Sequence, residues 1–269
     1  MGFDWNGWLN IILRWVHVFA GIMWVGATYF FTWLDGRFHE LEEAATSGGT
    51  EKHVWMVHSG GFYVVEKQAV PKMMTMKLHW FKWEAMTTWL SGMSLLVLVY
   101  YTGGLLADAM FDETTSTLIG LGSLAVAWFI YDAIWNSSLA KNNSVAVVVS
   151  FLLAVAAMYF FSRIYGGRTA YIQTGAMFGT LMAMNVWVRI IPGQQKLVAA
   201  LKKGEVPDLT LSARAKARSK HNTFMVVPVV FTMISNHYPT LTYGTDYALP
   251  LLVALVLVGW IAARFLRKA

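Results

Sequence analysis

Four histidines are spaced so that they could hold a redox cofactor. His221 and His237 lie 16 residues apart, and a helix separates such positions by about 24 Å along its axis, so they cannot bind one metal ion. If each pairs with a histidine at matching depth, His79 meets His221 near one end of a helix bundle and His17 meets His237 near the other. Two neutral imidazoles that face each other across a bundle can be the axial ligands of a b-type haem, which needs no cysteine. We therefore expect one or two haem b groups, although histidines at helix ends are also common as interfacial residues that water or a carbonyl satisfies.

A second group of residues could bind and deprotonate a flat, anionic, hydrogen-bonding heterocycle. Aromatic faces stack such a ring, Lys and Asn meet its oxygens, and a His or Glu can remove a proton. Segment 58–68 is too polar to cross a membrane and too apolar for an ordinary linker, so we expect it to fold back against the membrane face beside residues 77–84. The predicted catalytic residues are His58, Glu84 and Lys82, and the predicted substrate-binding residues are Trp80, Trp83, Asn222 and Lys77. Lys82 and Glu84 could instead form an interfacial pair, with the lysine stem lying along apolar surface.

The elements that must position these residues are membrane-spanning helices. Hydrophobic types make up 57% of the 269 residues and charged types 13%, against roughly 25% charged in a soluble domain. These proportions exclude a soluble enzyme, a disordered chain and a fibrous repeat. About 20 mostly apolar residues cross a bilayer as a helix, and seven stretches qualify: 11–34, 79–101, 117–136, 144–162, 172–191, 221–237 and 247–266. We predict a single all-α membrane domain over residues 1–269, with the sixth span the shortest and interrupted by Pro228.

The distribution of basic residues predicts the orientation of these spans. Alternate connections hold 15 Lys and Arg on one side and 2 on the other, which places the N-terminus outside and the C-terminus in the cytoplasm. The first span follows Asp4 rather than a basic stretch, so we expect it to be retained rather than cleaved as a signal peptide. The formal charge of +6 is then explained by anchors on the lipid bilayer rather than by nucleic acid. We expect a bacterial-type cytoplasmic (inner) membrane.

The chain contains no cysteine. It therefore has no disulfide, no thiolate metal site, no cysteine nucleophile and no covalently attached c-type haem, which needs a C-x-x-C-H site.

Several strings of the sequence resemble the membrane domain of the cytochrome c-linked, membrane-bound urate oxidase family. The strings are His58-Ser-Gly-Gly-Phe-Tyr, Leu78-His-Trp-Phe-Lys-Trp-Glu-Ala, Trp128-Phe-Ile-Tyr-Asp and His221-Asn-Thr-Phe, with Trp15-Val-His-Val-Phe-Ala-Gly near the start. The resemblance implies oxidation of urate to 5-hydroxyisourate in purine degradation, with water supplying the oxygen and two electrons passing to cytochrome c. Family members typically continue into a c-type cytochrome domain, whereas this chain stops at Ala269. We therefore expect a separate c-type cytochrome or respiratory pool to accept the electrons.

Two other functions compete with a urate-oxidising enzyme. The first is a non-catalytic haem-bearing or structural subunit of a larger respiratory or photosynthetic complex. The second is a transporter, for which internal repeats and helices broken at the midplane are expected. No clear repeat is visible in the sequence, so the transporter is the weaker alternative.

Overall fold

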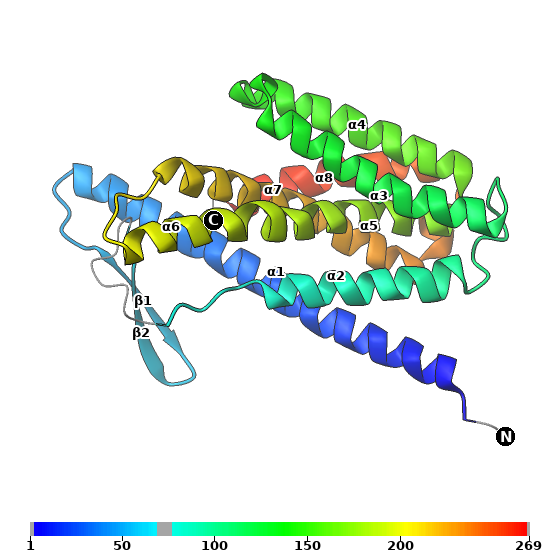
Figure 1. The fold of residues 1–269 in the computed structure, drawn as a ribbon, viewed down its shortest axis with the longest axis horizontal. Helices are drawn as coiled ribbons and strands as arrows, with labels where there is room; N and C mark the ends of the chain where they lie inside the picture. Colours follow the sequence, from blue (N-terminus) through cyan, green and yellow to red (C-terminus); the bar gives the residue numbers. More distant parts are fainter. Residues whose placement is uncertain (1–2, 69–76, 268–269) are drawn as a thin grey trace.

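The computed structural model describes residues 3–68 and 77–267 of the chain, so residues 69–76, which lie between the first two predicted spans, are outside the described part. Helices dominate the structure, as predicted, and one β-hairpin accompanies them (Figure 1). The helices are α1 (Trp5–Thr46), α2 (Trp83–Leu95), α3 (Glu113–Asn136), α4 (Asn143–Ile164), α5 (Gly167–Met184), α6 (Ile191–Lys202), α7 (Leu209–Ile234) and α8 (Ala248–Leu266). A π-helical stretch, η1 (Leu96–Tyr101), continues α2, and another, η3 (Asn185–Ile190), joins α5 to α6.

Within residues 3–68 and 77–267, 5 helical segments are long and apolar enough to cross a membrane. They are α1, α3, α4, the continuous run Gly167–Lys202 and α8. The two remaining predicted spans correspond to α2 with η1 and to α7. Only 13 residues of the former are α-helical, and α7 begins with a polar first half that contains the basic run 214–220. The seven-span count and the orientation stay predictions.

The first helix is longer than the predicted span 11–34 at both ends. Asp4 caps its start by accepting a hydrogen bond from the Gly7 N–H at 2.9 Å. Beyond residue 34 polar side chains pair along one face and support the helix, as in Arg37 with Glu40 at 2.7 Å and His39 with Glu43 at 3.4 Å. Such i, i+3 and i, i+4 pairs favour a helix even where the sequence is polar. The helix therefore continues 12 residues beyond the end of the predicted span, to Thr46.

Segment 58–68 is part of a hairpin, which the sequence analysis did not predict. Strands β1 (His53–His58) and β2 (Gly61–Glu66) pair antiparallel. The turn between them is Ser59-Gly60, with φ of 49° and 79°, and positive φ at both positions is the conformation that suits the twist of a two-residue hairpin. Val54 packs with Leu34 and Phe38 of α1, so the segment folds back onto the extension of α1.

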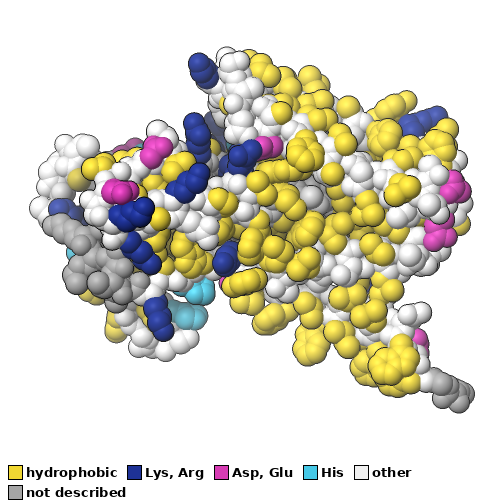
Figure 2. All heavy atoms as spheres, in the orientation of Figure 1, with side chains coloured by type: hydrophobic (Ala, Val, Ile, Leu, Met, Phe, Trp, Pro, Cys, Tyr) yellow, Lys and Arg dark blue, Asp and Glu magenta, His cyan; other side chains and the backbone are white. Residues whose placement is uncertain are grey.

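Helix α5 occupies the centre of the bundle. It packs against α2, α3, α4 and α7, and Figure 1 shows it between the α1–α2 pair and the α3–α4 pair. Most of its side chains are buried. Figure 2 shows hydrophobic side chains over the middle of this face, with Lys and Arg gathered toward the end that carries α6 and the hairpin. Helix α5 and its continuation η3 can therefore bring residues of otherwise separate helices to a common depth.

Candidate functional site

Lys82, Trp83 and Trp187 contact one another where α2 begins beside η3. These three residues and Glu84, which follows Trp83 in the chain, are here called the indole cluster. The Lys82 Nζ lies 5.0 Å from the Trp83 ring centroid and 5.4 Å from that of Trp187. The two indoles meet edge to face with centroids 5.6 Å apart. An ammonium group over two indole rings is attracted by their electron-rich faces, so this contact favours a position of the half-buried Lys82 beside the two indoles.

Two buried polar atoms of the indole cluster have no hydrogen-bond partner among the described residues. They are Glu84 Oε2 and Trp187 Nε1. A buried acceptor or donor without a partner costs about 1–3 kcal/mol, so each atom is able to bind a water molecule or a ligand. Glu84 lies in the first turn of α2, where the helix dipole favours a negative charge. The cluster thus combines aromatic walls, a cation, an acceptor and a donor.

A second group of polar side chains lies on the opposite side of η3. The Tyr131 hydroxyl and His221 Nδ1 share a hydrogen bond of 2.7 Å. Asn185 Nδ2 donates to the Tyr131 oxygen and to Asn222 Oδ1, both at 2.9 Å. Asn222 in turn donates to the Met182 carbonyl at 3.1 Å. This network joins α3, α5 with η3, and α7 through hydrogen bonds.

The Asp132 carboxylate holds two arginines next to this network. Its oxygens accept from Arg189 and, at 2.9 Å, from the Arg218 guanidinium. The Arg218 side chain is 6% exposed, and its guanidinium lies 5.0 Å from the Tyr131 ring centroid. Two cations share one carboxylate, so the region carries one excess positive charge.

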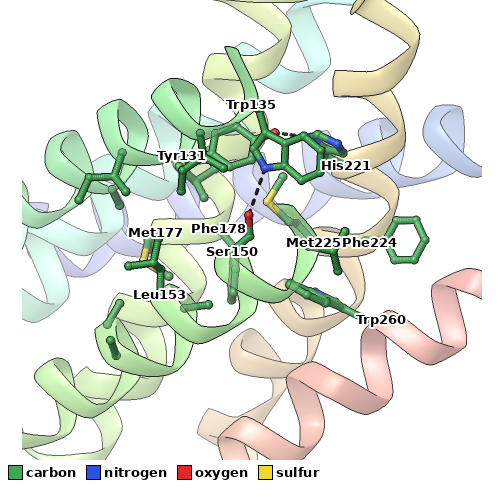
Figure 3. A pocket seen from close by; sticks show the side chains of 18 of the residues that line it. Tyr131, Trp135, Ser150, Leu153, Met177, Phe178, His221, Phe224, Met225 and Trp260 are labelled. Atoms are coloured by element: carbon green, nitrogen blue, oxygen red, sulfur yellow. Dashed lines mark hydrogen bonds between the residues drawn. The ribbon is translucent and has the colours of Figure 1, made fainter. Parts of the chain in front are cut away.

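His221 also borders a cavity of about 790 Å³ between α3, α4, α5, α7 and α8 (Figure 3). The lining is mostly apolar, with Leu153, Met177 and Trp260 among its side chains. Trp135 packs on His221 with ring centroids 4.0 Å apart and donates from Nε1 to Ser150 Oγ at 3.2 Å. The polar and charged residues of the lining include Asn143, Ser144, Lys220, His221 and Arg264.

The structure separates the predicted catalytic and substrate-binding residues into different places. Trp80 and Trp187 both pack against the buried group of Ala85, Val186 and Ile191, so Trp80 lies in the same region as the start of α2. Asn222 is buried in the hydrogen-bond network instead. His58 is exposed at the end of the hairpin, opposite Gly61, and Lys77 is exposed ahead of α2. No hydrogen bond or ring contact among the described residues joins His58, Lys77 or Asn222 to the indole cluster.

The four predicted haem ligands have separate surroundings. His17 Nδ1 lies 2.9 Å from the Thr88 carbonyl oxygen and 3.2 Å from Ser91 Oγ. His79 is exposed, and its ring meets Phe81 edge to face at 4.5 Å. His237 is exposed in the short helix η4 (Ser235–His237).

Neither histidine pair is joined by a contact within residues 3–68 and 77–267, and no group of three or more His, Cys, Asp or Glu side chains gathers there to hold a metal ion. Of the four histidines, only His221 lines the 790 Å³ cavity.

Sequence reasoning missed Trp187 and the cavity. Asn185 and Arg189 stand out as polar residues in a span, and Trp187 lies between them, but a tryptophan in a membrane helix is most often an interfacial or packing residue. Its role depends on α2, which lies about a hundred residues earlier in the chain. The cavity has no signal in the sequence, because residues of five separate helices line it.

The comparisons with known proteins give one finding. The model of a family described as urate oxidase N-terminal matches residues 4–269. No curated protein and no solved structure matches the chain.

Proposed function

Because the chain belongs to the urate oxidase N-terminal family, we propose that it is a membrane oxidoreductase that oxidises urate to 5-hydroxyisourate. The observation that carries the proposal is the buried, unpartnered carboxylate oxygen of Glu84, the residue that follows Trp83, together with the Lys82 ammonium that lies over the Trp83 and Trp187 indoles. Urate is flat and anionic, and it carries N–H donors and carbonyl acceptors. The indole cluster offers a complementary group for each of these properties.

Each residue of the indole cluster has a distinct task in binding urate. Trp83 and Trp187 supply aromatic surface for the planar ring, and the Lys82 ammonium neutralises its charge. Trp187 Nε1 is a free donor for a urate oxygen, and Glu84 Oε2 is a free acceptor for a urate N–H or for a water proton. The cavity beside His221 suits urate less well because most of its lining is apolar.

The reaction requires a base and an electron acceptor. Urate and one water molecule give 5-hydroxyisourate, two protons and two electrons. Glu84 acts as the base that takes a proton as water adds to the purine ring, and Lys82 stabilises negative charge that develops on the ring oxygens. General bases of this kind contribute about 10²–10⁴-fold in rate. The electrons leave to a separate acceptor, a c-type cytochrome or another respiratory carrier.

Haem b stays a prediction. The side chains around the four histidines do not fit bis-histidine ligation, because His79 and His237 are exposed and His17 faces Thr88 and Ser91 of α2. No step of the proposal therefore passes through haem. An absorption spectrum of the purified chain, repeated after His79→Ala and His17→Ala, tests the prediction directly.

The membrane placement follows the charge distribution. Basic side chains gather at the end of the molecule with α6 and the hairpin (Figure 2), and Lys and Arg favour the cytoplasmic face. The indole cluster lies at the start of α2, after the hairpin in the chain, so we propose that urate enters from the cytoplasm of a bacterial-type cell.

A matched pair of variants tests the proposed function. Glu84→Gln keeps the size of the side chain and removes the base, so kcat for urate oxidation should fall by about 10²-fold or more. Glu113 also lies in the first turn of a helix, α3, and is exposed, so Glu113→Gln should leave kcat within about twofold of the unsubstituted protein. The assay is urate consumption by membranes with a soluble artificial oxidant. No urate consumption by the unsubstituted chain, or equal rates in the two variants, refutes the proposal.

A structural-subunit function is supported by one feature of α1. Its first half buries almost no side chain, and Trp5, Trp15 and Phe19 are 76%, 75% and 61% exposed. Figure 1 shows this end of α1 extending away from the other helices. Such a face is covered either by lipid or by another membrane subunit of a respiratory or photosynthetic complex. Stoichiometric copurification with such a complex, combined with no urate turnover, would establish the subunit function.

A further inference from the structure

We propose that the cavity beside His221 binds a membrane quinone, which accepts the two electrons of the oxidation. This inference rests on the proposed function, because that reaction releases two electrons that another molecule has to accept. Quinones combine a long apolar chain with a small polar ring. The cavity has the same division, with a mostly apolar lining and a few polar groups.

The size and exposure of the cavity suit a ligand that arrives from lipid. Its volume of about 790 Å³ lies within the range of roughly 300–1,000 Å³ that is usual for small-molecule sites. Val126 of α3 and Val148 of α4 both line it and are 55% and 56% exposed. The cavity is therefore open to the surface of the bundle, at apolar side chains that lipid covers.

His221 can donate a hydrogen bond to a quinone oxygen. Asn185 already donates to the Tyr131 oxygen, so the Tyr131 hydroxyl proton can point to His221 Nδ1, 2.7 Å away. A neutral imidazole that accepts at Nδ1 carries its proton at Nε2. That N–H is then the donor for a quinone carbonyl, and the Tyr131 hydroxyl holds the imidazole in this tautomer.

The charges near His221 favour a ligand that becomes electron-rich. Lys220 and Arg264 line the cavity with His221, and the neighbouring Asp132 is shared by Arg189 and Arg218. Negative charge that arrives on a quinone ring is stabilised by these cations. A phospholipid phosphate would also be attracted to Lys220 and Arg264, but the apolar lining leaves little room for the second charged or polar headgroup that a phospholipid carries, whereas a quinone needs only the one donor that His221 provides.

Helix η3 connects the cavity to the indole cluster. Trp187 contacts Trp83, while Asn185, two positions earlier, bonds Tyr131 on the other side. Two positions on a helix point in nearly opposite directions, and a helix with its side chains is about 10–12 Å wide. The two sites thus flank a single helix.

Urate, water and quinone give 5-hydroxyisourate and quinol, since the two electrons and two protons lost by urate and water are those that quinone takes up.

Two neighbouring leucines of α4 allow a matched test. Leu153 lines the cavity, whereas Leu152 is 60% exposed and does not. The full chain in nanodiscs is titrated with decylubiquinone, a short-chain quinone, and bound quinone is measured at equilibrium without urate. Leu153→Trp fills part of the cavity and should weaken binding at least tenfold, and Leu152→Trp should bind like the unsubstituted chain. Ala157→Leu, a smaller change in the lining, replaces Leu153→Trp if that variant does not fold.

The outcomes separate this inference from the proposed function. Quinone binding that only the cavity variants weaken, followed by quinol formation when urate is added, supports both. The same binding without quinol formation supports the cavity as a quinone site and refutes urate as the electron donor to it. No binding, equal binding in the two leucine variants, or a tightly held phospholipid or haem that decylubiquinone does not displace refutes the quinone site.

Discussion

Asp132→Asn should strongly destabilise the bundle, because it removes the carboxylate that two arginines share. The Asp132 side chain is 14% exposed, that of Arg218 6% and that of Arg189 41%. Removing one partner of a buried ion pair costs about 3–5 kcal/mol, since the remaining charge stays buried. The pair with the more exposed Arg189 is worth less than about 1 kcal/mol. Because Asp132 is not fully buried, we expect a loss near the lower end, about 3 kcal/mol.

Asp35→Asn is the matched control for this substitution. Asp35 also faces two cations, Lys67 at 3.2 Å and Lys216 at 3.9 Å, but its side chain is 46% exposed. An exposed pair contributes about 0–1 kcal/mol, so this variant should unfold almost like the unsubstituted protein. The measurement is unfolding in detergent micelles at a fixed detergent concentration, followed by near-ultraviolet circular dichroism.

A double variant separates the loss of the ion pair from other effects of the substitution. Adding Arg218→Met to Asp132→Asn removes the buried charge that the single variant leaves unpaired, so part of the lost stability should return. Equal effects of Asp132→Asn and Asp35→Asn, or a further loss in the double variant, would contradict the burial argument.

Two more substitutions test the indole cluster and the packing of α1 on α2. Lys82→Gln removes the cation held over Trp83 and Trp187. In steady-state assays the KM for urate should therefore rise about tenfold, which corresponds to about 1.4 kcal/mol of binding free energy. An unchanged KM would show that Lys82 does not contact the substrate anion. Gly92→Ala places a methyl group 2.8 Å from His17 Cε1 and should cost about 1–3 kcal/mol through overpacking. Gly26, where no atom lies within 4 Å of an added Cβ, is its control, and Gly26→Ala should be neutral or stabilising because alanine favours a helix.

Local signals in the sequence were sufficient for much of the fold. The predicted spans 117–136, 144–162 and 247–266 differ from α3, α4 and α8 by only a few residues, because long apolar runs end at clear polar caps such as Asp112 and Asn142. The resemblance to a urate oxidase-related family is confirmed by the match over residues 4–269. The grouping of Trp80, Lys82, Trp83 and Glu84 also follows from adjacency in the chain.

The same signals failed where polar segments adopt regular structure. The end of α1 and the start of α7 are too polar to be recognised by hydropathy, yet both are helical. The hairpin alternates apolar and polar residues weakly, and it is held by packing on α1. Local side-chain pairs extend α1, and packing on α1 holds the hairpin. Hydropathy along the chain measures neither kind of contact.

The sequence by itself determined the class of the structure, because its long apolar runs form helices, and 5 helical segments within the described residues are long and apolar enough to cross a membrane. It also determined which residue types are available for proton transfer and for binding an anion. The tertiary structure alone decided which of them meet. The central helix α5 and its continuation η3 bring Trp187 to the start of α2 and Asn185 to Tyr131 and His221. These partners are set by the packing of helices that are remote in the chain. In such packing the shape of the side chains, rather than the local sequence pattern, selects the neighbour.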